Sequence, residues 1–192
     1  SLVCMAFLPV SLLPVELAVL FVFITYSFWI EVKNIAGLDL VYHALFPALY
    51  GLLGYVLYHP LDITGIVYVL LLGIFGAVGE LGNEIRDLEK DRTERKNTAV
   101  IIGERAAFVL TIAFMACAFG IIAVFAFLEP GFFWLLPFVP FGLFLFHPVV
   151  RAMKNPEYKQ QFVDVINNRA ILLAAAMLVL YGFMHGTLFS LS

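Results

Sequence analysis

Charge is scarce in this sequence, and the shortage argues against an ordinary soluble domain. Of its 192 residues only 13% are Asp, Glu, Lys or Arg, whereas 63% are hydrophobic and 16% are aromatic. A soluble domain is typically about 45–50% apolar. The excess predicts an integral membrane protein. The net charge of −3 says little here, because the position of each charge along such a chain matters more than the sum.

Cysteine is equally scarce, and several catalytic motifs are missing. Cys4 and Cys117 lie in apolar segments without a CxxC pair, so neither a disulfide framework nor a thiolate metal site is predicted. The sequence has no Gly-rich nucleotide-binding loop, no nucleophile elbow and no HExxH. Its histidines share no metal-ligand spacing: His43, His59, His147 and His185. We expect no nucleic-acid partner.

Long apolar stretches predict an all-α fold, a polytopic transmembrane bundle of about six complete helices forming one domain over residues 1–192. A bilayer crossing needs about 20 mostly apolar residues. Stretches that approach this length run from Leu12 to Ile30, Leu40 to Tyr58, Ile63 to Leu81, Ala99 to Leu128, Phe132 to Val150 and Ala170 to Leu191. Residues 1–11 resemble the tail of an earlier apolar segment, closed by Pro9 and Pro14. We therefore expect the chain to be the C-terminal part of a larger bundle.

The basic residues predict which loops share a side of the membrane. With six crossings, loops 31–39, 82–98 and 150–169 fall on one side, and 59–62 and 129–131 fall on the other. Every Lys and Arg lies in or beside the first group: Lys33, Arg86, Lys90, Arg92, Arg95, Lys96, Arg105, Arg151, Lys154, Lys159 and Arg169. Because cytoplasmic loops are enriched in Lys and Arg, we expect the charged loops of this multi-pass protein to be cytoplasmic.

One stretch, residues 80–105, interrupts the apolar pattern with six of the eleven basic and seven of the fourteen acidic residues. Within it, Asn83, Asp87 and Asp91 recur every four residues, which on a helix places three oxygen-bearing side chains on one face. Such a set suits Mg²⁺, which is usually held by one or two carboxylates together with substrate phosphates. The interleaved Lys and Arg residues suit the phosphates. The stretch predicts a Mg²⁺–diphosphate site.

Each of these features also has a simpler interpretation. A run of charge is usually a solvated, salt-bridged loop. Tyr26 and Lys33 suit either a phosphate contact or an interfacial aromatic residue followed by a snorkelling lysine. Glu80 lies at the membrane boundary, where an ionisable residue suggests function, and it is either a general base, a supporting group or a surface residue. The predicted helix that leads into this charged stretch carries small residues that favour close packing: Gly65, Gly73, Gly76, Gly79 and Gly82.

The charged stretch carries a family resemblance. The segment from Asn83 through Asp87 and Asp91, followed by Thr98 and an apolar run that ends at Gly103, resembles the second aspartate motif of the UbiA superfamily of intramembrane prenyltransferases. In that family a DxxxD is followed by a Thr and then by an apolar stretch ending in Gly. The match covers roughly the C-terminal two thirds of such an enzyme.

An upstream pair extends the resemblance. Tyr26 is followed seven positions later by Lys33, similar to the Tyr and basic residue that the family places two crossings before the motif. The family's first motif, NDxxDxxxD, is absent, since no Asp precedes Tyr26. The run Thr93-Glu-Arg-Lys stands where the family commonly has a Gly, and Glu31 lies where it tends to be basic. These departures leave the acceptor open.

The resemblance implies a bundle whose cavity opens to the cytoplasm and the lipid, where Mg²⁺ bridges a polyprenyl diphosphate to two aspartate motifs. It implies catalytic and metal-binding roles for Asp87 and Asp91, a metal-ligand role for Asn83, and diphosphate contacts for Tyr26, Lys33 and Arg92. The implied partners are a polyprenyl diphosphate, a small aromatic or hydroxyl acceptor, the lipid bilayer and the missing N-terminal helices. A non-catalytic membrane protein, such as a transporter half or a scaffold, is the alternative.

Overall fold

The structure is a computed structural model that describes residues 12–26, 32–128, 136, 138–159, 161–166, 168–169 and 172. These residues form helices and connecting turns, with no strand among them, which confirms the predicted all-α fold. The single predicted domain divides into two compact units, Ser1–Ala107 and Phe108–Ser192.

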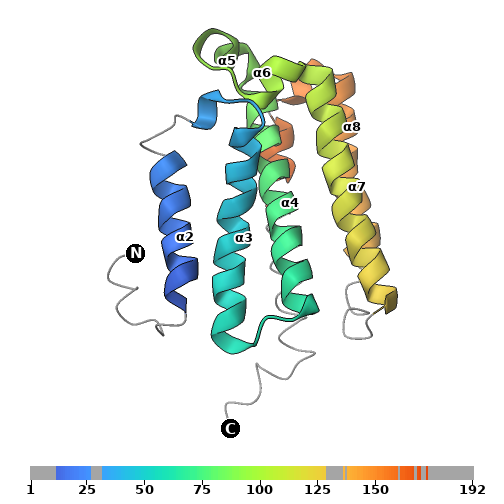
Figure 1. Ribbon diagram of the computed structural model, residues 1–192. Coiled ribbons are helices and arrows are strands. Elements are labelled where there is room, and N and C mark those ends of the chain that lie inside the picture. Colours follow the sequence, from blue (N-terminus) through green and yellow to red (C-terminus); the bar gives the residue numbers. More distant parts are fainter. Residues whose placement is uncertain are drawn as a thin grey trace. The chain divides into compact units, whose positions relative to one another are not determined.

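Three helices form the body of the first unit: α2 (Leu13–Ile24), α3 (Leu38–Tyr58) and α4 (Ile63–Arg86). Helix α3 packs against both of the others and more extensively against α4. The three helices run alternately up and down (Figure 1). This arrangement brings the start of α3 to the same end of the unit as the end of α4.

Short elements gather at that end of the first unit. The 3-10 turn η3 (Val32–Asn34) leads into α3, and α5 (Leu88–Glu94) and α6 (Thr98–Ile102) follow α4. Figure 1 shows α5 and α6 beyond the end of α4. Both α5 and α6 contact α4. The predicted charged stretch therefore folds over the end of the α3–α4 pair.

Glycines in α4 allow a close approach to α3, as the sequence predicted. A Cβ atom at Gly73 would lie 3.3 Å from the backbone oxygen of Ala44, and one at Gly76 would collide with the backbone oxygen of His43. Pro47 has no N–H group, so the His43 carbonyl lacks its usual donor four residues along the helix. Gly76 therefore lies against the His43 carbonyl, which receives no hydrogen bond from position 47 of α3. Gly79 meets nothing within 4 Å, so it has no part in this contact.

The expected span Ala99–Leu128 is wrong as a single helix. The chain breaks at Gly103, whose φ of 82° lies in the left-handed region that favours glycine. Residues before the break form α6, and residues after it form α7 (Glu104–Leu128). Gly103 therefore ends a short helix at the polar end of the first unit, before the long apolar helix begins.

The second unit contains α7 from Phe108 onward, α8 (Phe138–Lys154) and the 3-10 turn η5 (Pro156–Tyr158). Pairs of aromatic rings contribute to its interior. The rings of Phe108 and Phe162 lie 5.5 Å apart, and those of Phe119 and Phe146 lie 6.0 Å apart. This unit is therefore held mainly by apolar contacts, and it does not contain the predicted charged motif.

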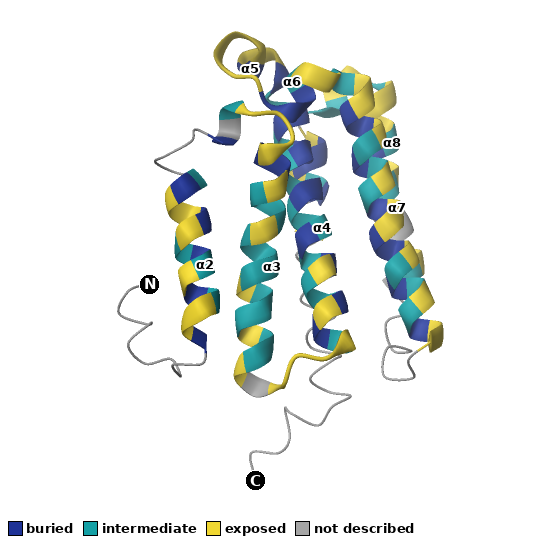
Figure 2. Ribbon diagram, in the orientation of Figure 1, coloured by how far each residue is buried: buried dark blue, intermediate teal, exposed yellow. Residues whose placement is uncertain are grey.

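Among the described residues, three helices are long and apolar enough to cross a membrane: Leu38–Leu57, Ile63–Arg86 and Glu104–Leu128. They indicate a membrane-embedded protein, in which the exposed large apolar residues would meet lipid. Figure 2 shows exposed residues recurring along the helices. The predicted count of six is not confirmed. In the predicted Leu12–Ile30 span the described helix, α2, has 12 residues, shorter than the roughly 17–25 that a crossing needs. Apart from Leu172, the predicted Ala170–Leu191 span lies outside the described residues.

Candidate functional site

The predicted acidic ladder does not lie on one uninterrupted helix. Asn83 is in the last turn of α4, Asp87 forms the junction, and Asp91 is in α5. Hydrogen bonds with helical spacing continue across the junction, from the Asp87 N–H to the Asn83 oxygen (2.9 Å) and from the Asp91 N–H to the Asp87 oxygen (2.9 Å). The backbone at Asp87, with φ −93° and ψ 7°, nevertheless departs from helical geometry and separates α4 from α5.

Asp87 faces its neighbour Arg86. The Arg86 Nε donates to Oδ1 at 2.9 Å and its Nη2 donates to Oδ2 at 3.0 Å, so both carboxylate oxygens are engaged. The Asp87 side chain is 45% exposed. The Arg86 hydrogen bonds hold the pKa of the Asp87 carboxyl below its usual value, so this group is a carboxylate at neutral pH. It is available to a cation that approaches from solvent.

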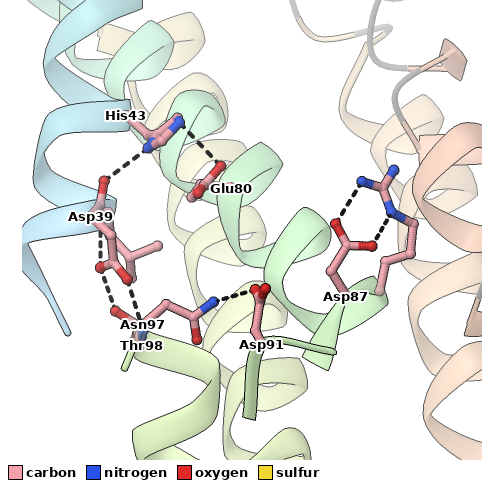
Figure 3. A network of polar contacts seen from close by, with 9 residues as sticks. Asp39, His43, Glu80, Asp87, Asp91, Asn97 and Thr98 are labelled. Carbon is pink, nitrogen blue, oxygen red and sulfur yellow. Dashed lines mark hydrogen bonds and ion pairs between the residues drawn. The ribbon is translucent and has the colours of Figure 1, made fainter. Parts of the chain in front are cut away.

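Asp91 has the opposite environment. The residue is only 4% exposed, and its Oδ2 accepts a hydrogen bond from the Asn97 Nδ2 at 2.8 Å. Its Oδ1 lies 3.9 Å from the Arg95 Nε. Figure 3 shows Asp91 turned toward Asn97, whereas the hydrogen bonds of Asp87 go to Arg86. The two aspartates predicted to act as a pair are therefore directed to different partners.

A second polar cluster, which is centred on Asp39 and was not predicted from the sequence, lies at the start of α3. Asp39 is 1% exposed and accepts hydrogen bonds from the Thr98 N–H (2.7 Å), the Thr98 hydroxyl (2.5 Å) and the Leu40 N–H (2.7 Å). The Thr98 hydroxyl also accepts from the Gly37 N–H at 2.7 Å. These bonds join the beginning of α3 to the beginning of α6, although 59 residues separate Asp39 from Thr98.

Side chains from α3, from α4 and from the N-cap residue of α6 accept the first N–H groups of α6. The N–H groups at a helix start have no partner inside the helix. Asp39 accepts from the Thr98 N–H, the Glu84 Oε2 accepts from the Ala99 N–H (2.8 Å), and the Asn97 Oδ1 accepts from the Val100 N–H (3.0 Å). This helix start is thus filled by the protein's own oxygens and is not free to bind a phosphate.

His43 and Tyr26 extend the polar region toward α2. The His43 Nδ1 lies 3.0 Å from the Asp39 backbone oxygen, and its Nε2 lies 3.1 Å from the Glu80 Oε2 (Figure 3). The Tyr26 ring meets the His43 ring edge to face, with centroids 5.2 Å apart. It also contacts Phe46, at 5.7 Å. The predicted diphosphate residue Tyr26 therefore lies against α3 and one contact away from Glu80.

The remaining predicted residues are less closely tied to this region. Lys33 lies in η3, but its side chain is outside the described part of the structure. Arg92 is exposed and pairs with Glu89 at 3.1 Å on the surface of α5. Asn83 is half-buried and its side chain hydrogen-bonds with Glu80. The structure therefore does not bring Arg92 to the Asp39, His43 and Glu80 side chains.

A metal ion would find few protein ligands here. Within the described ranges, no three His, Cys, Asp or Glu side chains are grouped so that they could hold a metal ion. The predicted set supplies two carboxylates and one amide. Their chemistry suits Mg²⁺, because this ion keeps several waters and is often bound by one or two carboxylates plus substrate phosphates. The Arg86–Asp87 pair is partly exposed and hence weak, so a competing cation loses little by displacing Arg86.

Comparison with protein-family models, with curated proteins and with solved structures finds no match.

The sequence carried signals for the residues that were missed. An ionisable side chain within an apolar run is costly in a membrane and suggests a role with a partner. Like Glu80, Asp39 and His43 are ionisable residues in an apolar run, near the start of the run that forms α3. Asn97 stands immediately before an apolar segment, as a helix N-cap residue does.

Proposed function

We propose that this protein is a UbiA-like prenyltransferase of the membrane, which transfers a polyprenyl group from its diphosphate to an aromatic or hydroxyl acceptor with Mg²⁺ as cofactor. One observation carries the proposal. Three segments of the predicted motif, around Tyr26, Asp91 and Thr98, are joined by contacts through Asp39, His43 and Asn97 at one end of the α3–α4 pair. A merely solvated loop would not need contacts to all three, of which those to Asp91 and Thr98 are buried.

The proposed roles follow from the chemistry of each side chain. Asp87 and Asp91 would hold Mg²⁺, with Asn83 as a further oxygen ligand. When bound, Mg²⁺ would supply positive charge that stabilises the departing diphosphate. The hydroxyl and cationic groups that would bind diphosphate oxygens belong to Tyr26, Lys33 and Arg92.

The reaction breaks the allylic C–O bond, and the electron pair leaves with the diphosphate. A ring carbon or hydroxyl oxygen of the acceptor forms the new bond to the allylic carbon and releases a proton. In this proposal the substrate's prenyl chain lies in the lipid, and the charged loops that carry the ligands face the cytoplasm, as the distribution of Lys and Arg favours.

A non-catalytic role, as a scaffold or part of a transporter, is the second candidate. It is favoured by the partners that the two aspartates already have, since Arg86 engages both oxygens of Asp87 and Asn97 engages Asp91. In that case the charged stretch would only stabilise the end of the bundle, and no divalent cation would bind there.

Thermal unfolding of the full-length protein in detergent distinguishes the two. We expect Mg²⁺ together with farnesyl thiolodiphosphate, an unreactive substrate analogue, to raise the unfolding midpoint. A ligand present at 100 times its dissociation constant stabilises the folded state by about 2.7 kcal/mol. Asp87→Asn should abolish the rise while leaving the midpoint without ligand nearly unchanged, because the side chain is partly exposed and its pair with Arg86 is weak.

Asp62→Asn is the matched control, because Asp62 is an exposed acid at the opposite end of α4. This variant should keep the full ligand-dependent rise. If Mg²⁺ and the analogue leave the midpoint of the wild-type protein unchanged, the enzymatic proposal fails and the scaffold interpretation replaces it.

A further inference from the structure

We infer that Asp39 is a positioning residue for Asp91, acting through Thr98 and Asn97. The inference deepens the proposed function and rests on it for its catalytic consequence. Its structural content stands on the hydrogen bonds alone.

The first link is the attachment of Thr98 to α3. Both Asp39 oxygens are used, since Oδ2 accepts from the Thr98 N–H while Oδ1 accepts from the Thr98 hydroxyl and the Leu40 N–H. The hydroxyl hydrogen is committed to Asp39, and the Gly37 N–H occupies an acceptor position on the same oxygen. Hydrogen bonds to a carboxylate are roughly twice as strong as neutral ones. Thr98 is therefore held in one orientation.

The second link is the orientation of Asn97. Its Oδ1 accepts from the Val100 N–H and its Nδ2 donates to the Asp91 Oδ2. A flipped amide would place its NH₂ against an N–H donor and its oxygen against a carboxylate, so only one orientation satisfies both partners. Asn97 adjoins Thr98 in the chain, and it is 3% exposed. Fixing Thr98 therefore fixes the amide that holds Asp91.

Contacts other than the Asn97 hydrogen bond constrain Asp91 only weakly. Helix α5 has only seven residues, and an isolated helix of that length is unstable in water. Within α5, the Arg95 contact to Asp91 spans 3.9 Å, and the Arg95 side chain is 41% exposed, so it constrains the carboxylate weakly. The Asn97 bond at 2.8 Å is shorter and buried. The orientation of Asp91 thus depends on Asn97, and Asn97 in turn is fixed through Thr98 by Asp39 of α3.

Asp39→Asn tests the inference without a change of size. An asparagine has one acceptor oxygen, so either the Thr98 N–H or the Leu40 N–H loses its partner and faces an NH₂ group. Losing the direct partner of a metal ligand typically lowers metal affinity roughly 10- to 100-fold; because Asp39 acts through Thr98 and Asn97, we expect the half-saturating Mg²⁺ concentration for stabilisation by farnesyl thiolodiphosphate to rise by up to about 10-fold. Thr98→Val should also raise the half-saturating Mg²⁺ concentration, because it removes the hydroxyl. Thr98→Ser keeps the hydroxyl and should retain the wild-type value.

Hydrogen–deuterium exchange supplies a readout that does not depend on the enzymatic proposal. In Asp39→Asn, amides of residues 88–97 should exchange faster than in the wild-type protein. Tyr55→Phe is the control, since it removes a hydrogen bond from the opposite end of α3, and it should leave that segment unchanged. Faster exchange confined to residues 37–41 and 98 would overturn the inference.

A double-mutant cycle completes the test. Asn97→Asp keeps an oxygen for the Val100 N–H but replaces the donor to Asp91 with an acceptor. If Asp39 acts through Asn97, the exchange rates of residues 88–97 in the double variant should be no faster than in the more affected single variant. Additive effects would show that Asp39 acts independently of Asn97. If the wild-type protein gives no Mg²⁺ response, the proposed function fails, while the exchange data still decide the positioning role.

Discussion

The two ends of the α3–α4 pair each use an aspartate to accept backbone N–H groups, yet the two aspartates differ in burial. Asp62 caps the start of α4 by accepting from the Gly65 N–H at 2.9 Å and also accepts from the Tyr55 hydroxyl at 2.7 Å. It is exposed to solvent. Asp39 accepts from Thr98 and Leu40 and is 1% exposed.

The difference shows how burial changes the consequence of the same chemistry. At the Asp62 end, the hydrogen bond from the Tyr55 hydroxyl is exposed, so water can replace the acceptor if Asp62 is removed. At the Asp39 end, an N–H group without its acceptor bears the full cost of lost hydration. Buried polar contacts therefore fix the geometry of the groups they join as well as stabilising the fold. This makes the Asp39 end suitable for holding ligands in fixed positions.

The largest expected effect comes from truncating the two aspartates. Asp39→Ala leaves the Thr98 N–H and the Leu40 N–H without acceptors, and at roughly 1–3 kcal/mol for each buried donor we expect a loss of about 3 kcal/mol in the free energy of unfolding. Asp62→Ala should lower stability less, because Asp62 and its hydrogen bond with Tyr55 are exposed to water and the Gly65 N–H is only part-buried. The unfolding midpoints of both variants in detergent measure the difference. Equal midpoints would mean that the buried end is hydrated.

A smaller effect on stability is expected from replacing glycines at the contact between α3 and α4 with alanine. A Cβ at Gly76, toward the Asp39 end, would collide with the His43 backbone oxygen, whereas one at Gly51, farther along α3, would meet the end of the flexible Leu72 side chain. We expect Gly76→Ala to cost about 1–3 kcal/mol through overpacking. Gly51→Ala should cost less, because Leu72 can rotate and alanine favours the helix by up to about 1 kcal/mol.

The same midpoint measurement checks this pair of glycines. If Gly51→Ala is the more destabilising variant, then backbone contact does not distinguish the two ends of the α3–α4 pair. A greater loss of ligand-dependent stabilisation in Gly76→Ala would further connect helix packing to the position of His43.

The sequence predicted the helices of this fold better than their ends. Apolar runs identified α3, α4 and α7 because burial or contact with lipid requires such runs. The break at Gly103 was missed, since composition alone does not reveal a positive φ. The break at Asp87 has no glycine or proline to mark it. Ile85 and Leu88 on either side are both buried, so the apolar pattern passes through the junction without interruption.

The site was predicted in part. Asp91 follows Leu81, Ile85 and Leu88 at helical spacing, and these three are at most 2% exposed, so the sequence contained evidence that Asp91 would face inward. The Asp39–Thr98 contact is different, because it joins positions 59 residues apart and depends on how α6 folds back to α3. Local patterns cannot report such a contact. The ligands of Mg²⁺ and diphosphate remain predictions.

The smallest expected effect concerns the exposed Asp62 and the partly exposed Asp87, which lie at opposite ends of α4. The Gly65 N–H and the Tyr55 hydroxyl lower the pKa of Asp62, and the Arg86 hydrogen bonds lower the pKa of Asp87. A folded-state pKa below the unfolded value of about 3.9 contributes stability that is present above that pH and is lost as the pH falls through the folded value.

We therefore expect the unfolding midpoint, measured without divalent cations, to fall below about pH 4. Asp62→Asn and Asp87→Asn should each make that fall slightly shallower. At neutral pH, Asp62→Asn should remain close to wild type, because an asparagine oxygen can still accept the Gly65 N–H as a helix cap. Unchanged acid sensitivity in both variants would place the pH dependence in the buried carboxyl groups, and the contrast between exposed and buried aspartates would then extend to protonation as well as to geometry.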